Sequence, residues 1–407
     1  MSPGEDVKDR LRKIKERAKD AVSKTPDVGP DVDLSKLRFE PGPEEGATGD
    51  LAERASSVGI DMSGKGRAGT YVQIDYSAMV DRMTSGNVEI MSISRAIDTY
   101  DWLTDYYWRA MDVDVDKFAA LAELRGSGGY FIRARRGAKV ELPVQACLYL
   151  RTPNLAQNVH NIVVVEEGAE LHVITGCASP VTIEGLHVGV SELYVKRDAS
   201  LTFTMIHGWS NEMDVRPRTG VVLEENASFK SVYVNLNPVK SLQSAPVVYL
   251  NGPNSKASLI SIIAASDRSY FDVGNTAYLR GRGSRAEITS KVVAKDEARV
   301  ISRGSIVGEG EGVKGHLDCR GIILNPAATI LAIPQLEAKA KDLELSHEAA
   351  VGKIAEEEIY YLLARGFDEE EAVSTIIRGF MDVDVKDFPP ALAAQVEKTL
   401  DIIAKSL

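Results

Sequence analysis

The chain has 407 residues, 44% of them hydrophobic, which is enough for two or three domains and a large core. Its formal net charge of −11 argues against a nucleic-acid partner, which requires a basic face, and no apolar run reaches the length of a membrane span. Three cysteines make no disulfide framework, and the charged N-terminus lacks the apolar stretch of an export signal. We therefore expect a cytoplasmic protein with reduced thiols that binds neither nucleic acid nor membrane.

The first 125 residues are predicted to form a helical region that contains a linker. Apolar residues at helical spacing on a charged surface predict an amphipathic helix over about residues 5–24. Prolines and glycines then punctuate a linker over residues 25–65. From Tyr71 to about Leu124 the spacing of apolar residues is again mostly helical.

Residues 126–335 consist of short β-branched runs broken by turns, and one turn recurs. Glycine or a polar residue precedes an alanine, then a polar and an apolar residue, at Ala138, Ala169, Ala199, Ala227, Ala257 and Ala286. Subtracting successive positions gives steps of 31, 30, 28, 30 and 29, and a steady period of this kind marks stacked solenoid units. A small residue at the same corner lets neighbouring coils stack closely. We therefore predict a mainly β fold with a β-helix core; the alternative, an antiparallel sandwich, would show turns every ~8–12 residues.

Residues 336–407 are predicted to form a C-terminal helical domain. One helix is expected over Gly352 to Ala364, and a second opens after Asp368 with acids in its first turn, where the helix dipole favours them. A third is expected after Pro389-Pro390. Because a β-helix exposes strand edges at both ends, we expect the flanking helical segments to cap them.

One stretch near the C-terminus gathers residue types that bind soft metals. A thiolate from Cys319, an imidazole from His347 and a carboxylate from Glu348 would, if they converge, suit iron or zinc. Side chains alternate along a strand, so Cys319 and Leu317 are expected to point one way and His316 the other, which makes His316 the weaker ligand candidate. His347 and Glu348 are adjacent and would diverge on a regular strand. Both can serve one site only from a turn or across a dimer seam.

Cys177 ends an alternating run that is predicted to face the interior of the β-helix. A dry interior suppresses thiolate character, so Cys177 is either an inert core thiol or part of an interior tunnel. Cys147 receives no role. The chain has no phosphate-binding Gly-x-x-x-x-Gly-Lys-Ser/Thr motif, so it is not expected to bind or hydrolyse ATP.

Several motifs, in order along the chain, resemble those of the SufB/SufD family, which belongs to the SUF system of iron–sulfur cluster assembly. They are Asp116-Lys117-Phe118-Ala119-Ala120-Leu121, Gly128-Gly129, Val140-Glu141-Leu142-Pro143, Glu166-Glu167-Gly168 through Thr175-Gly176-Cys177-Ala178-Ser179-Pro180, Ser346-His347-Glu348-Ala349 through Ile354, Arg365-Gly366-Phe367-Asp368-Glu369-Glu370 and Gly379-Phe380. Together they cover roughly residues 115–385. The resemblance implies a right-handed parallel β-helix between helical domains and pairing of two such subunits. It also implies that an ABC-type ATPase, SufC, docks on the C-terminal helices.

The resemblance further implies roles for single residues. Cys319 matches the SufB cysteine proposed to bind the nascent cluster, and His347 and Glu348 match nearby ligand candidates. Cys177 matches the cysteine proposed to receive sulfur from a desulfurase, and Trp209 matches a tryptophan of the sulfur-transfer tunnel.

The chain also departs from the family pattern. His207 replaces a glutamine before Trp209, and Tyr149 and Arg151 stand where SufB proteins have an arginine and an asparagine in the tunnel. The N-terminal Cys-x-x-Cys motif of some SufB proteins is absent. These departures favour the single scaffold of a minimal, archaeal-type SUF system that acts as a homodimer.

We therefore expect a non-enzymatic scaffold that takes sulfur from a donor, assembles a transient iron–sulfur cluster at a dimer interface and passes it to acceptor apo-proteins. ATP hydrolysis is expected in the SufC-like partner. One alternative is a SufD-like structural partner that carries no cluster and forms a heterodimer with a paralogue. A second is a carbohydrate-active β-helix enzyme, which needs paired carboxylates over a groove; the sequence shows no such pairing.

Overall fold

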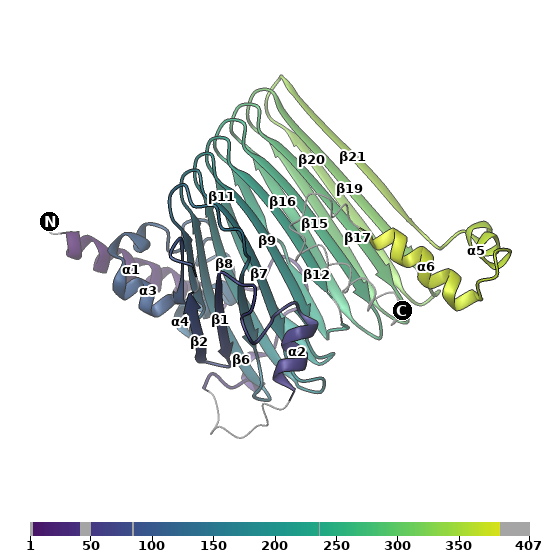
Figure 1. Cartoon of the computed structure of the whole chain (residues 1–407), viewed down its shortest axis with the longest axis horizontal. Coiled ribbons are helices and arrows are strands. Elements are labelled where there is room, and N and C mark those ends of the chain that lie inside the picture. Colours follow the sequence, from purple (N-terminus) through teal and green to yellow (C-terminus); the bar gives the residue numbers. More distant parts are fainter. Residues whose placement is uncertain (1–2, 41–49, 84, 236, 383–407) are drawn as a thin grey trace.

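The computed structural model of the protein describes residues 3–40, 50–83, 85–235 and 237–382. Its strands stack in parallel, coil upon coil, into a solenoid with two broad sheets (Figure 1). The predicted mainly β, parallel β-helix fold is thus confirmed. The ten-stranded sheet has the order β2-β1-β5-β7-β9-β12-β15-β17-β19-β21, and β10, β13, β16, β14, β11, β8, β6, β4, β3, β18 and β20 make up the eleven-stranded sheet.

The helices are α1 (Pro3–Ala21), η1 (Leu34–Lys36), α2 (Leu51–Ser57), α3 (Ile93–Thr99), η2 (Asp101–Asp105), α4 (Lys117–Leu124), α5 (Glu356–Leu363) and α6 (Glu369–Met381). The strands are β1 (Gly69–Ile74), β2 (Ser77–Met83), β3 (Val88–Ser92), β4 (Tyr130–Ala134), β5 (Val144–Tyr149), β6 (Leu155–Val165), β7 (Glu170–Ala178), β8 (Gly185–Val195), β9 (Ser200–Gly208), β10 (Met213–Val215), β11 (Arg218–Leu223), β12 (Ser228–Asn235), β13 (Ser241–Ser244), β14 (Val247–Leu250), β15 (Lys256–Ala265), β16 (Tyr270–Leu279), β17 (Arg285–Ala294), β18 (Arg299–Gly308), β19 (Val313–Ile323), β20 (Thr329–Ala338) and β21 (Leu343–Gly352).

Each coil turns at a corner made of a left-handed residue followed, in most coils, by a small one. Backbone φ lies between 54° and 67° at Gly137, Gly168, Asp198, Asn226, Asn254, Gly283 and Gly312, which are residue types that tolerate this conformation. The predicted alanine column is correct as far as Ala227. Beyond it the column holds Ser255 and Ser284, because Lys256 pairs with Ser228, only 28 residues earlier. Ala257 and Ala286 therefore lie two residues further along their strands than the corner.

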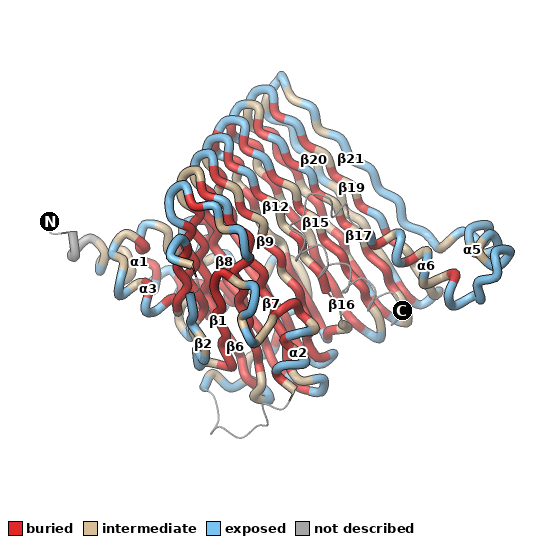
Figure 2. The backbone as a smooth tube through the Cα atoms, in the orientation of Figure 1, coloured by how far each residue is buried: buried red, intermediate tan, exposed pale blue. Residues whose placement is uncertain are grey.

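Three apolar layers hold the solenoid together. The interior between the two sheets is filled by side chains that alternate along the strands, such as Leu201 and Phe203 of β9. A second layer lies on the outer face of the ten-stranded sheet, under α2 and α6, and a third lies between the eleven-stranded sheet and α1 with α4. Burial follows the stacked strands and ends at β21, which is largely exposed (Figure 2).

The predicted domain boundaries need two corrections. First, the region from Tyr71 is not all helical: β1 pairs in parallel with β5 and starts the solenoid, while β2 and β3 pair antiparallel with β1 and β4 and cap its first coil. Second, β20 and β21 carry the solenoid to Gly352, past the predicted end at 335. The residues of β21 include helix formers such as Glu344, Leu345 and Ala349, and parallel pairing with β19 overrides that preference.

The C-terminal helices confirm two of the three that were predicted. α6 begins with a capping box between Asp368 and Glu371 and packs Ile377 and Met381 against the outer face of the ten-stranded sheet. α5 buries no residue. The helix predicted after Pro389-Pro390 lies outside the described residues. The described helices leave the free edges of β20 and β21 uncovered, contrary to the expected C-terminal cap (Figure 1). None of them combines the length and apolar character needed to cross a membrane.

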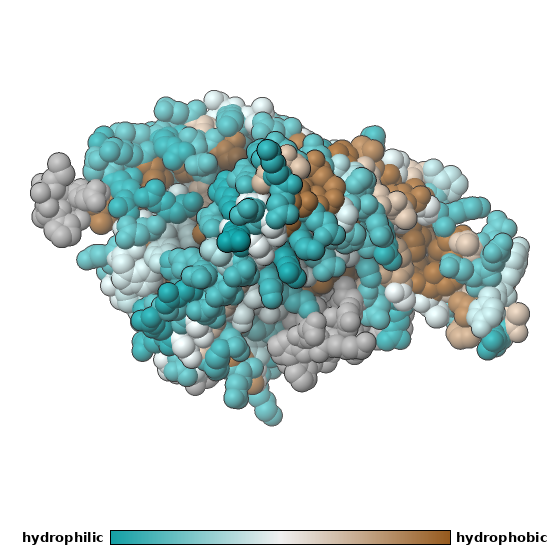
Figure 3. All heavy atoms as spheres, turned by 90° about the horizontal axis from the view of Figure 1, so that it is seen from above, coloured by the Kyte–Doolittle hydropathy of each residue, from teal (hydrophilic) through white to brown (hydrophobic). Residues whose placement is uncertain are grey.

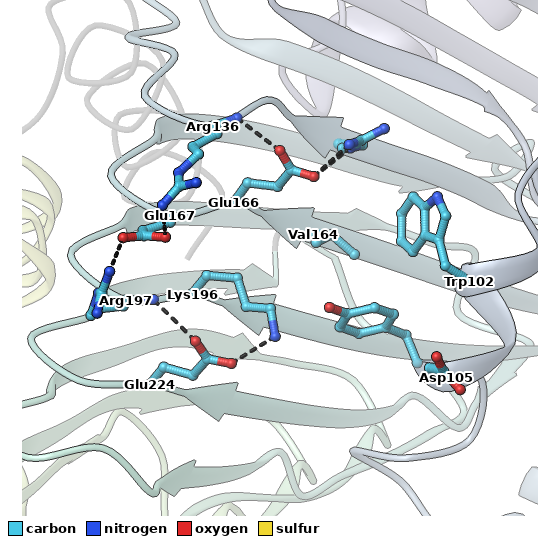
Figure 4. A pocket seen from close by; sticks show the side chains of 11 residues that line it. Trp102, Asp105, Arg136, Val164, Glu166, Glu167, Lys196, Arg197 and Glu224 are labelled. Atoms are coloured by element: carbon cyan, nitrogen blue, oxygen red, sulfur yellow. Dashed lines mark hydrogen bonds and ion pairs between the residues drawn. The ribbon is translucent and has the colours of Figure 1, made fainter.

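At the corners of the first coils, charges alternate in sign from one coil to the next. Glu167 is held between Arg136 of the coil before and Arg197 of the coil after, and Lys196 donates to Glu224 at 2.6 Å (Figure 4). These residues line a hollow of about 900 Å³. Because each cation faces a carboxylate, the hollow is electrostatically satisfied by its own lining.

Close backbone contact between coils predicts the effect of Gly281→Ala. A Cβ at Gly281 would lie 2.0 Å from the carbonyl oxygen of Gly252 in the coil before, and backbone cannot move aside as a flexible side chain does. We expect a loss of about 3 kcal/mol in unfolding free energy, measured by denaturant titration with circular dichroism. Gly86→Ala is the control, since a Cβ there meets nothing within 4 Å. Equal midpoints for the two variants would contradict the close stacking.

Candidate functional site

Cys319 lies on β19, in the last coils of the solenoid, with its side chain in the interior. It is 2% exposed and belongs to the same apolar core as Leu317, as the alternation predicted, whereas His316 points outward and contacts Ser346 at 2.9 Å. Burial raises the pKa of the Cys319 thiol, and a hydrogen bond with Ser302 partly offsets that rise. Cys319 is therefore a protonated thiol in the single chain, close to the end of the solenoid.

His347 and Glu348 lie on β21, the terminal strand, where they pair with Leu317 and Asp318 of β19. His347 is on the side of the strand that faces the interior and Glu348 is on the outer side, so the two diverge as expected for a regular strand. Both are exposed. Within the described residues, no group of three or more His, Cys, Asp or Glu is placed to hold a metal ion. One chain thus brings Cys319 and His347 to neighbouring strands but does not assemble the predicted ligand set by itself.

The free edge of β21 is built differently from edges that natural proteins protect. Such edges carry proline, lysine or inward charges; β20 has Pro334, whereas β21 has neither proline nor lysine. Ala349 is the residue of β21 that pairs with Cys319, and its small side chain leaves the thiol near the edge. Seen from above, apolar atoms gather towards the C-terminal part of the molecule (Figure 3), where Leu331 and Val351 are among the exposed apolar residues.

Cys177 also faces the interior, as predicted, but far from the edge. It pairs with His207 on β9, whose Nδ1 lies 3.0 Å from the Tyr233 hydroxyl. Burial raises the pKa of Cys177 well above that of a free thiol. Cys147 belongs instead to the apolar layer outside the ten-stranded sheet, with Val58 and Ile60, and burial raises its pKa to about 12.

Trp209 lies between two buried imidazoles. Its ring centroid is 4.6 Å from that of His187 and 5.9 Å from that of His207, and its indole Nε1 has no hydrogen-bond partner. His187 contacts Gln157 at 2.8 Å. Burial lowers the pKa of each histidine to about 3, so both are neutral at physiological pH.

A row of interior polar side chains, missed in the sequence, joins the two cysteine regions. Tyr233, Ser261, Ser290 and Cys319 pair directly from strand to strand through β12, β15, β17 and β19. From the opposite sheet, Asn275 donates to Ser261 at 3.2 Å, and Ser302 lies 2.8 Å from Ser290. A cavity of about 40 Å³ adjoins Tyr233 and Ser261. The signal that would have revealed the row is its spacing of 28, 29 and 29 residues, which is the solenoid period itself.

The buried histidines predict a pH dependence of stability. Their pKa is about 3 in the folded chain and about 6.5 when unfolded. The unfolded state therefore binds protons first, and stability falls as pH drops from about 6.5 towards 3, by up to ~1.4 kcal/mol per pH unit for each histidine. We expect His207→Gln to flatten this slope and His316→Gln, which lies outside the interior, to leave it unchanged. Denaturant titrations across this pH range measure it; an unchanged slope in His207→Gln would refute the assignment.

Comparison with known proteins agrees with this architecture. Residues 148–380 match the family model described as SUF system FeS cluster assembly, SufBD core domain. The chain is 44% identical to an iron–sulfur cluster assembly SufBD family protein of Methanothermobacter thermautotrophicus, over 98% of this chain and 100% of that protein. It is 45% identical to a protein of the same description from Archaeoglobus fulgidus, over 89% and 98%, and 29% identical to iron–sulfur cluster assembly protein SufB of Bacillus subtilis, over 81% and 71%. The chain therefore belongs to the SufBD family of iron–sulfur cluster assembly proteins.

Proposed function

We propose that the protein is the scaffold on which an iron–sulfur cluster is built, at a site completed by a second chain. The observation that carries this proposal is the position of Cys319 and His347 on the last two strands of one sheet, beside an edge whose backbone groups are unpaired. The described part of one chain offers no complete ligand set. A second edge would bring a second thiol, imidazole and carboxylate to the same seam. A cluster held by few thiolates at a seam is suited to release rather than to storage.

Symmetry restricts how two copies join at β21. An isologous contact places the same edge on both subunits, and two identical strand edges form matching hydrogen bonds when they run antiparallel. In that arrangement the inner faces of both strands lie on the same side. His347 of each copy then lies near the small Ala349 of the other, and Ala349 pairs with Cys319. Glu348 remains on the outer face and is the more peripheral ligand candidate.

Sulfur is proposed to enter at Cys177 and to reach Cys319 along the interior polar row. The two cysteines are five strands apart, about 24 Å at ~4.8 Å per strand, so they do not exchange sulfur directly. The Cys177 thiolate would attack the outer sulfur of a donor persulfide, form its own persulfide and release the donor thiolate, with no net change of electrons. Release of that sulfur as sulfide takes two electrons from a thiol or another two-electron donor. His207, neutral and next to Cys177, is placed to take the thiol proton.

The C-terminal helices are the proposed dock for a SufC-like ABC ATPase, which would hydrolyse the ATP. α5 carries Tyr360, Tyr361 and Leu363, which are 63%, 59% and 36% exposed, and Phe367 beyond it is 39% exposed. Large apolar side chains gathered on an exposed helix mark an interaction surface. Since α5 follows β21 directly, movement of a bound ATPase would act on the dimer seam.

A SufD-like structural partner, without its own cluster and paired with a paralogue, is the second candidate function. It is favoured by the burial of Cys319 within the single chain, which keeps the thiol protonated. The carbohydrate-active alternative loses its basis, because family membership points to cluster assembly.

The test is anaerobic reconstitution with iron and sulfide, followed by iron content and visible absorption. We expect wild type to gain a cluster and Cys319→Ala to lose most of it, because the seam loses its thiolate. Cys147→Ala is the matched control: it removes a buried cysteine from the outer layer and is expected to bind as wild type does. Equal binding by wild type and Cys319→Ala would refute the ligand set. No binding by wild type, even with the ATPase, would favour the SufD-like function.

The sulfur route predicts a different result for Cys177→Ala. With sulfide in solution the variant is expected to assemble a cluster as wild type does, because sulfide reaches the seam without passing Cys177. With a cysteine desulfurase and cysteine as the only sulfur source, assembly is expected to fall at least about tenfold, since the receiving thiol is missing. Equal loss from both sources would show that Cys177 is structural, and equal activity from both would show that sulfur bypasses it.

A further inference from the structure

The outer face of the ten-stranded sheet carries a row of cations at the beginning of its last strands. Lys256, Arg285 and Lys314 pair with one another from strand to strand on β15, β17 and β19. All three are exposed and line a hollow of about 570 Å³. Lys314 pairs with Glu344 at 2.7 Å, and Glu287 lies two residues after Arg285. In the part of the chain that the structure describes, Lys256 and Arg285 form no ion pair.

This row differs from the corners of the first coils. There the sign alternates, so that Glu167 separates Arg136 from Arg197. Along the row three cations follow one another at a strand spacing of ~4.8 Å, an arrangement that destabilises a sheet unless anions lie nearby. In a chain of net charge −11, stacked cations of this kind are a surface for an acidic partner.

α5 offers acids in excess of what its own chain uses. Glu356, Glu357 and Glu358 form its first turn and are all exposed. Lys353 pairs with Glu356 at 3.4 Å, whereas Glu357 and Glu358 have no ion pair among the described residues. The helix buries no residue, so its position is not fixed by packing within one subunit.

Antiparallel pairing of β21 brings these two features together between subunits. The end of β21 in one copy then lies beside its beginning in the other, where the cationic row starts. α5 follows Gly352 after a short link and lies at the end of β21 (Figure 1). Its eight residues span about 12 Å, against ~10 Å between β21 and β17. We propose that the acidic first turn of α5 in one subunit docks on the row Lys256–Arg285–Lys314 of a second copy, a contact that rests on the proposed edge-to-edge dimer.

This contact would give α5 two surfaces with separate tasks. Its exposed tyrosines remain available to the ATPase, while its first turn holds the neighbouring subunit. Force on α5 would then break ion pairs across the seam that closes over Cys319. The charge pairing also adds specificity, since a partner lacking either half is rejected.

A charge-swap mixing experiment tests the contact in the full chain. The row variant is Lys256→Glu/Arg285→Glu and the helix variant is Glu357→Lys/Glu358→Lys, all exposed positions. In either homodimer both contacts are repulsive, whereas in the mixed dimer one contact joins two reversed partners and the other joins two native ones. We expect each variant alone to dimerise about tenfold more weakly than wild type and the mixed dimer to regain wild-type affinity. Native mass spectrometry of differently tagged chains reads out the mixed fraction.

The controls separate this inference from the dimer on which it rests. Lys8→Glu/Lys15→Glu on α1 makes the same charge change away from the row and is expected to mix at random with the helix variant. A monomeric wild type at all concentrations would overturn the proposed dimer and this contact with it. A dimeric wild type whose row and helix variants pair at random would overturn this contact alone.

Discussion

Parallel backbone pairing between successive coils is the constraint on which the rest of this structure depends. Each strand satisfies its N–H and C=O groups with the coil before and the coil after, so every coil must turn at the same height. The left-handed residues from Gly137 to Gly312 provide those turns. The same rule leaves the last strand half satisfied. β21 has β19 on one side and no described neighbour on the other, and this unmet requirement is the physical basis for a second subunit.

Stacking in register also turns a periodic sequence into straight rows of side chains. One such row is polar within an apolar core, and buried polar groups are costly unless they are paired. Ser261 and Ser290 meet Asn275 and Ser302 from the opposite sheet, so the row is satisfied where it lies. Apolar residues would fill the same positions without needing partners. Retaining polar ones between Tyr233 and Cys319 is what a route for a small polar sulfur species would require.

How much of this was visible in the sequence differs from one part to another. The period of about 30 residues predicted the stacked coils, and the Leu317–Cys319 alternation predicted which way the thiol points. The alanine column slipped at Ala257 because a serine at the true corner is as small as an alanine. β21 was predicted to be helical because its composition favours helix, and pairing that decides the matter is not local. The convergence of Cys319, His347 and Glu348 could not be predicted from one chain, because one chain does not produce it.

The measurement that tests the central claim most directly is hydrogen–deuterium exchange of the dimer, followed over residues 343–352. If β21 pairs with its copy across the seam, its amides exchange as slowly as those of β19, and dilution to monomer releases them. Fast exchange along β21 in a sample that is fully dimeric would mean that the subunits meet elsewhere. The cluster site at the seam would then have no structural basis.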